Sequence, residues 1–226
     1  MATSSDAFPS NDKLITLLNE HGYNIVHIFD PLHLLKNMRN NLWKEPLTSN
    51  GITFNLNTLD DLLQNINGET RRLFNLLHPD SPFPKDQMDL APIRGLLKEN
   101  LIRALKDSEE QSAKKLGEYL HHMRLFDKAT TDNDMDNGAR FRDLESVVAY
   151  FRTLKGLTSG LVHQLTTTVE SLKAVHAISE SVDNGFEFRV SVLGTIVVEN
   201  YFSTVRSKCR YPKFVGVRCL QQEGVL

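Results

Sequence analysis

Cysteine is scarce in this chain, with only Cys209 and Cys219 among 226 residues. The two form no CxxC pair, and no histidines accompany them at the spacing of a zinc site. Neither a structural zinc site nor a disulfide-stapled scaffold is therefore supported. Two free thiols are the expectation for an intracellular protein.

Long apolar runs are missing as well. No stretch approaches the roughly 20 apolar residues that a membrane helix needs. The N-terminal sequence MATSSDAFPSND has no apolar core of a signal peptide. The chain also has no GxxxxGK(S/T) loop to cradle phosphates. We therefore expect no membrane partner, no signal peptide and no P-loop.

What is present is an ordinary globular composition with an uneven distribution of charge. The chain is 40% hydrophobic and 24% charged, with a net charge of −2. Residues 24–44 carry three Lys or Arg against Asp30 alone, and residues 199–218 carry five against Glu199 alone. A solvated charged face explains one basic run. Two of them, each with one embedded acid, are what a phosphate-binding, metal-dependent site needs.

The strongest local pattern is a strand, an acid and a helix in direct succession. Residues 24–29 (NIVHIF) are typical of a buried strand. Asp30 and Pro31 follow, and Pro suits the first turn of a helix. The helical repeat then runs to about residue 43 through Leu34, Leu35, Met38 and Leu42. Asp30 has two interpretations: the N-cap of this helix, or an acid that holds a divalent metal against a phosphodiester.

Before and after this unit the pattern divides the chain into three parts. Residues 1–10 are small and polar and are expected to be frayed, and a helix follows at about 11–22. The turn signal at residues 49–51 (SNG) marks a boundary. Residues 51–184 are acidic and almost wholly helical. Residues 186–193 then alternate like a strand, and residues 197–208 form a helix with Glu199 in its first turn.

The helical part itself has several predicted pieces. A short strand is expected at 52–56, and Asn57 is the expected cap of the helix after it. We expect a solvated acidic loop at residues 130–138 (TTDNDMDNG), because it lacks the ligand spacing of an EF-hand. The other expected helices are 69–77, 92–123 with a break in the charged stretch 106–115, 139–155 and 158–182.

Two stretches resemble motifs of one protein family. FDPLHLLKNMRNNL, which contains Asp30, resembles the FDxPHLLKxxRNNL stretch of P element transposases and the related THAP-domain transposases. VVENYFSTVRSK, which contains Glu199, resembles their LENFFSxxRSK stretch near the far end of the catalytic domain. The two motifs occur in the family's order, separated by a helical block of roughly the right size.

The resemblance implies an α/β, predominantly helical fold in which an incomplete RNase H-like core is interrupted by an all-α insertion. The core would occupy residues 1–50 and 185–226, and the insertion residues 51–184. Asp30 and Glu199 fall on catalytic carboxylates that bind Mg²⁺ or Mn²⁺ in the family. The nearby side chains expected to hold DNA phosphates without reading bases are Lys36, Arg39, Arg206 and Lys208. A nuclear location, DNA as partner and a homo-oligomer are further implications of the resemblance.

The chain also departs from the family's pattern. The family's first catalytic Asp lies on an earlier strand. Here only Asp6 and Asp12 precede Asp30, in segments expected to be frayed or helical, so this carboxylate is expected to be missing. No THAP-type set of zinc-binding Cys and His residues is present either.

The nucleotide site of the family is matched in part. The family has Gln-Asp shortly before its second motif, where this chain has Thr195 and Ile196. Phe126 and Asp127 match the family's Phe-Asp pair that touches GTP, with different flanking residues. GTP binding is therefore doubtful. We expect a truncated or decayed transposase relative that is inactive alone. The alternative is a domesticated, non-catalytic module that contacts protein or nucleic acid.

Overall fold

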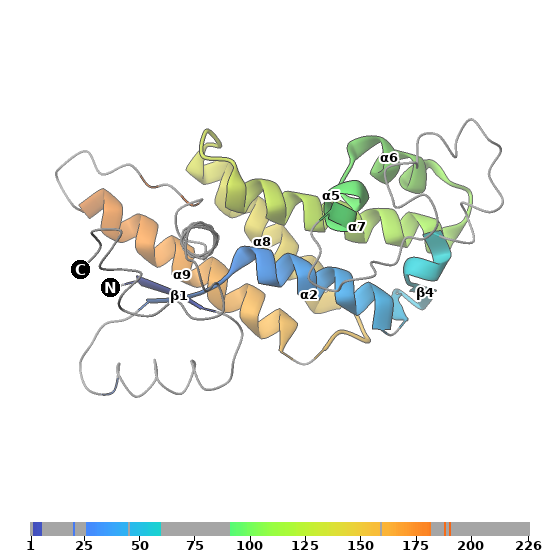
Figure 1. Cartoon of the computed structure of the whole chain (residues 1–226), viewed down its shortest axis with the longest axis horizontal. Coiled ribbons are helices and arrows are strands. Elements are labelled where there is room, and N and C mark those ends of the chain that lie inside the picture. The colour runs from blue at the N-terminus through green and yellow to red at the C-terminus, as the bar shows by residue number, and fades with distance from the viewer. Residues whose placement is uncertain are drawn as a thin grey trace, which may run out of the picture.

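A computed structural model describes residues 2–5, 20, 26–44, 46–59, 91–158, 160–181, 188 and 190 of the chain. The described part is predominantly helical with two small two-stranded sheets, which confirms the predicted fold class (Figure 1). Its elements are β1 (Ala2–Ser5), β2 (Val26–Phe29), α2 (Pro31–Lys44), β3 (Leu47–Ser49), β4 (Ile52–Phe54), α5 (Ala91–Leu96), α6 (Glu99–Asp107), α7 (Gln111–Thr131), α8 (Asn137–Thr153) and α9 (Leu161–Ser181).

The first sheet is a parallel pair formed by β1 and β2. Its register runs from Ala2 opposite Val26 to Ser5 opposite Phe29. The expectation that residues 1–10 are frayed is therefore wrong for Ala2–Ser5. The sequence ATSS has little strand preference of its own, but β2 offers it a row of backbone partners and β2 itself packs against α9. Tertiary pairing, not local preference, makes this strand.

The predicted unit of strand, acid and helix is confirmed. Ile28 and Phe29 of β2 are buried, and α2 begins at Pro31 and ends at Lys44. Its apolar stripe packs against α7 and α9, and the Tyr119 hydroxyl of α7 donates a 2.9 Å hydrogen bond to the Met38 carbonyl. The Figure 1 view shows α2 extended along the long axis together with α7 and α9. The core members that α2 contributes are Leu34, Leu35, Met38 and Leu42.

A β-hairpin follows α2. The strands β3 and β4 are antiparallel, with Leu47 opposite Phe54. Asn50 and Gly51 both have positive φ, 50° and 80°, as the tight turn of a two-residue hairpin requires. The short strand predicted after Gly51 is thus confirmed. Strand β3 was not predicted, because it has only three residues, follows Pro46 and contains the polar Thr48 and Ser49.

The helix after β4 begins two residues earlier than predicted. Residues 56–59 are helical. The Asn55 side chain accepts a 3.2 Å hydrogen bond from the Thr58 N–H, and the Thr58 hydroxyl accepts one of 3.2 Å from the Asn55 N–H. This reciprocal pair satisfies two N–H groups at the helix start. The predicted cap Asn57 is therefore wrong, because Asn55 performs that role.

Residues 91–131 form three helices where two were predicted. The predicted break in residues 106–115 is confirmed at residues 108–110, between α6 and α7. A second break separates α5 from α6 at residues 97 and 98. The two helices α6 and α7 then pack closely, since a Cβ on Gly117 would lie 3.0 Å from Leu105. Gly117 therefore permits the close approach of α6 and α7 on either side of the predicted break.

The turn between α7 and α8 is organised by a buried arginine. Arg140 has no exposed surface, and its guanidinium donates to the carbonyls of Ala129, Asp132 and Met135. Asp136 caps α8 by accepting a 2.8 Å hydrogen bond from the Ala139 N–H. The acidic loop predicted at 130–138 is therefore shorter, residues 132–136, and is tied to the core by one cation.

The last predicted elements are only partly covered. Helix α8 and helix α9 match the predicted helices at 139–155 and 158–182 within three residues at each described end. Phe188 and Val190, the described residues of the predicted strand at 186–193, are buried, and neither lies in a strand. The predicted helices at 69–77 and 197–208 lie outside the described residues. Within the part that the structure covers, no helix has the length and apolarity to span a membrane.

Candidate functional site

Asp30 lies at the junction of β2 and α2, as predicted. It directly follows Phe29 at the carboxyl end of β2 and is 1% exposed. A carboxylate at the carboxyl end of a parallel strand lies at the edge of the sheet where ligands bind in open α/β folds. This position is compatible with both predicted roles of Asp30.

Hydrogen bonds show that Asp30 caps α2. Its Oδ1 accepts a 2.9 Å hydrogen bond from the Leu32 N–H, and its carbonyl accepts one of 3.0 Å from the Leu34 N–H. The capping interpretation is therefore confirmed. A carboxylate has about four lone-pair positions, so a cap leaves acceptor capacity for another ligand.

His33 is a neighbour that sequence reasoning missed. Its Nδ1 lies 3.3 Å from Asp30 Oδ2, one helical turn along α2. The two carboxylate oxygens thus have different environments, one on the helix backbone and one beside an imidazole. The available signal was the spacing of three residues between an N-cap acid and a histidine, which brings the two side chains together.

Removal of the cap has a measurable cost. We expect Asp30→Ala to lower the free energy of unfolding by about 1–2 kcal/mol, because the Leu32 N–H loses its partner near the core. Asp30→Asn retains an acceptor for that N–H and should cost clearly less. Urea denaturation of both variants checks this. An equal loss for both would mean that charge, not capping, is what Asp30 contributes to stability.

The two predicted phosphate contacts on α2 differ in exposure. Lys36 is half-buried, so its ammonium is within reach of solvent. Arg39 has no exposed surface, and its Nε and Nη2 donate to the Asn40 side-chain oxygen at 3.2 and 3.0 Å. Arg39 is thus a buried cation of the core, and the predicted phosphate contact of Lys36 stays a prediction.

The predicted nucleotide pair, Phe126 and Asp127, lies in α7. Phe126 is fully buried in the hydrophobic core. Asp127 is half-buried, and burial raises the pKa of its carboxyl, against the opposing effect of Arg94 and Arg124. Within the described residues, these positions therefore combine a core aromatic ring with a partly desolvated acid beside two arginines.

The remaining predicted site residues are not covered. Glu199, Arg206 and Lys208 lie outside the described residues, so their predicted roles and the convergence of Glu199 with Asp30 stay predictions. Among the residues that the structure describes, no group of three or more His, Cys, Asp or Glu side chains is arranged to hold a metal.

Comparison with known proteins gives one informative likeness. No protein-family model matches the chain, and no curated protein matches it. Its fold is similar to that of a chain in the solved Drosophila P element transposase strand transfer complex, with a TM-score of 0.76 at 17% sequence identity. The similarity covers 93% of this chain and 55% of the other, so this chain spans about half the length of that one. At this identity the likeness establishes a transposase-like fold.

Proposed function

We propose that this chain is derived from a P element-type transposase and that its two motifs are the remains of a metal-dependent site for DNA cleavage and strand transfer. The observation that carries the proposal is the fold itself, because the likeness extends over 93% of the chain. The β2–α2 junction adds local support, since it delivers Asp30 to the sheet edge. A nuclear location and self-association belong to the same proposal.

Asp30 and Glu199 would hold Mg²⁺ or Mn²⁺ in this proposal. The pair suits such ions, because both prefer hard carboxylate oxygens completed by water and substrate oxygens. When bound, a pair of ions would supply activation of the attacking oxygen and stabilisation of the leaving oxygen of a phosphodiester. The task of the chain is to bring a strand-borne Asp and a distant Glu to one place, with His33 fixing the orientation of the Asp30 carboxylate.

The pairing of β1 with β2 suggests a candidate for the family's first catalytic carboxylate. Ser5 pairs with Phe29, and the next residues in the sequence are Asp6 and Asp30. In the sequence, each of the two paired strands is thus followed directly by an acid, which makes Asp6 a candidate for a further ligand. Asp6 lies outside the described residues. We propose Asp6 as the alternative to the expectation that the first acid is missing, and Mn²⁺ binding by an Asp6 variant tests it.

Metal binding tests the carboxylates separately. If Asp30 and Glu199 act without a third acid, we expect millimolar affinity for Mn²⁺, as a rough value, and no cutting of DNA by the chain alone. Asp30→Asn and Glu199→Gln should each abolish Mn²⁺ binding, measured by electron paramagnetic resonance. Asp6→Asn should abolish it too if three acids form the site. Asp134→Asn, in the exposed acidic loop, is the matched control.

The outcomes separate the interpretations. An Asp6→Asn variant that binds Mn²⁺ like the parent leaves two carboxylates and the inactive chain that the sequence predicts. Mn²⁺ binding that survives both Asp30→Asn and Glu199→Gln contradicts the proposed site. We do not extend the proposal to GTP, because Phe126 is fully buried.

A non-catalytic interaction module is the second candidate. One observation favours it. Arg39, the arginine of the basic segment 24–44, was predicted to hold a DNA phosphate but is buried in the core. Absence of DNA binding at low salt would decide for this module. The DNA-binding experiment is therefore the shared test of both candidates.

A further inference from the structure

A second basic region lies within the helical part of the chain, which is acidic as a whole. Residues 91–108 and 119–131 carry six Lys or Arg against three Asp or Glu. Residues 109–118, between them, carry two against three. Because α6 packs against α7, the two basic ranges face each other across the α6–α7 contact. The excess of positive charge is thus concentrated by the fold.

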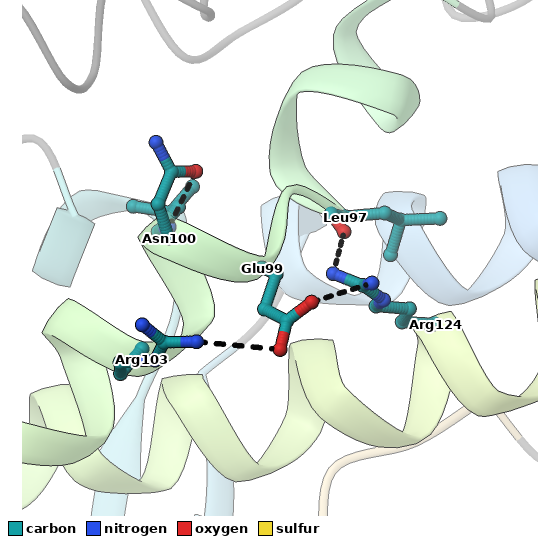
Figure 2. A network of polar contacts seen from close by, with 6 residues as sticks. Leu97, Glu99, Asn100, Arg103 and Arg124 are labelled. Carbon is teal, nitrogen blue, oxygen red and sulfur yellow. Dashed lines mark hydrogen bonds and ion pairs between the residues drawn. The ribbon is translucent and has the colours of Figure 1, made fainter.

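A single carboxylate positions two arginines at this contact (Figure 2). Glu99, at the start of α6, accepts from Arg124 of α7 at 3.0 Å and from Arg103 at 3.4 Å through its two different oxygens. Arg124 also donates to the Leu97 carbonyl at 3.4 Å. Arg94 and Arg124 also lie near the Asp127 carboxyl. Three guanidiniums thus meet two carboxylates, which leaves one positive charge over.

Next to this network the surface is hollowed. A pocket of about 120 Å³ has apolar walls from Ile102 and Leu125, and Arg124, His121, Lys128 and Glu99 complete its lining. Burial lowers the pKa of His121, and the positive charges of Lys106 and Arg124 lower it further. Burial is the larger cause of this lower pKa, and the contribution of Lys106 and Arg124 reflects the cations near this pocket, against the opposing effect of Asp143.

The cations extend beyond the pocket. Lys128 is exposed and follows Arg124 by four residues on α7, which places the two about 6 Å apart along one helix face. Arg103 is 70% exposed, and Arg94 and Lys98 are exposed on α5 and after it. One small anion would neutralise only part of the charge of these cations. The successive phosphates of a nucleic-acid strand would contact several of them.

We propose that the surface formed by Arg94, Lys98, Arg103, Arg124 and Lys128, here called the α6–α7 surface, binds the phosphodiester backbone of DNA. Arginine suits phosphate because its planar fork donates two hydrogen bonds, and Glu99 pre-orients two such forks. The contact carries no base readout. It rests on the proposed function, because it adds a second DNA contact to the surface that carries Lys36.

The test compares two exposed pairs of equal charge. Arg103→Gln/Lys128→Gln removes two cations from the α6–α7 surface, and Arg142→Gln/Lys155→Gln removes one exposed Arg and one exposed Lys elsewhere. A labelled duplex is titrated with full-length parent and variants at several salt concentrations. The first pair should weaken binding about tenfold at 0.1 M salt and lower the salt slope by about 2, one unit for each phosphate contact. The second pair should change both values little.

Two further arms sharpen the result. Glu99→Gln removes the negative charge that competes with phosphate but keeps an acceptor oxygen that can orient an arginine, so DNA affinity should rise. Pyrophosphate and GTP are titrated in place of DNA. The proposal is overturned if both pairs lose DNA affinity equally, if Glu99→Gln lowers it, or if Arg103→Gln/Lys128→Gln weakens only the small anions. If the parent binds DNA through Lys36, Arg206 and Lys208 while the α6–α7 pair has no effect, the proposed function stands and this inference fails.

Discussion

Replacement of Lys36, Arg206 and Lys208 together by Ala is expected to lower the affinity for duplex DNA by about 100-fold at 0.1 M salt and to reduce the salt slope by about 3. Each of these cations would release condensed counterions when it meets a phosphate, so binding by the parent should fall steeply with salt and be indifferent to base sequence. Titration of labelled duplexes of two unrelated sequences at about 0.05 and 0.2 M salt measures both values.

Arg39 is left out of this set because its guanidinium is buried, and its removal would perturb the core before it perturbed DNA binding. The control is Lys114→Ala/Lys115→Ala, in the first turns of α7, where Lys115 pairs with Glu118. These changes should leave binding nearly unaltered. Equal losses from both sets would show that general basicity, not a defined surface, attracts DNA. No binding by the parent at low salt would favour the interaction module.

The second large effect is on stability. Arg140→Met should lower the free energy of unfolding by about 3–5 kcal/mol, because three carbonyls at the α7–α8 turn lose a charged donor in a buried place. Arg140 also donates to Asn137, whose amide lies 2.9 Å from His176 Nε2 of α9. Its loss should therefore loosen the contact between α8 and α9 as well as the turn.

Urea denaturation followed by circular dichroism measures this cost. Arg142→Met is the matched control, since Arg142 lies two residues further along α8 and is exposed. It should change the free energy of unfolding by less than about 0.5 kcal/mol. A cost for Arg140→Met as small as that of the control would mean that water replaces the guanidinium at the three carbonyls, and that the turn does not depend on this side chain.

The features that sequence reasoning predicted well are those fixed by local chemistry. The strand before Asp30 and the helix from Pro31 follow from a β-rich run, a helix-starting proline and a helical apolar repeat. These local signals were sufficient to predict both elements. The same holds for α8 and α9, which have long continuous repeats.

The features that sequence reasoning missed depend on contacts between distant segments. The strand Ala2–Ser5 exists because β2 offers it a partner, which its polar sequence does not indicate. The burial of Arg39 and Arg140 could not be predicted either, because a charged residue reads as a surface residue until its acceptors are known. The α6–α7 surface could not be predicted either. Its cations are separated in the sequence by the acidic stretch 109–118, and the packing of α6 against α7 brings them together.

The central claim is that Asp30 and Glu199 belong to one metal site on a transposase-like fold. A crystal structure of the full chain grown with Mn²⁺ tests it most directly, because anomalous scattering locates the ion independently of any assumption about its ligands. The account predicts that the carboxylates of Asp30 and Glu199 lie within about 8 Å of each other, with Mn²⁺ between them. Carboxylates that face opposite sides of the fold would contradict it and leave helix capping as the function of Asp30.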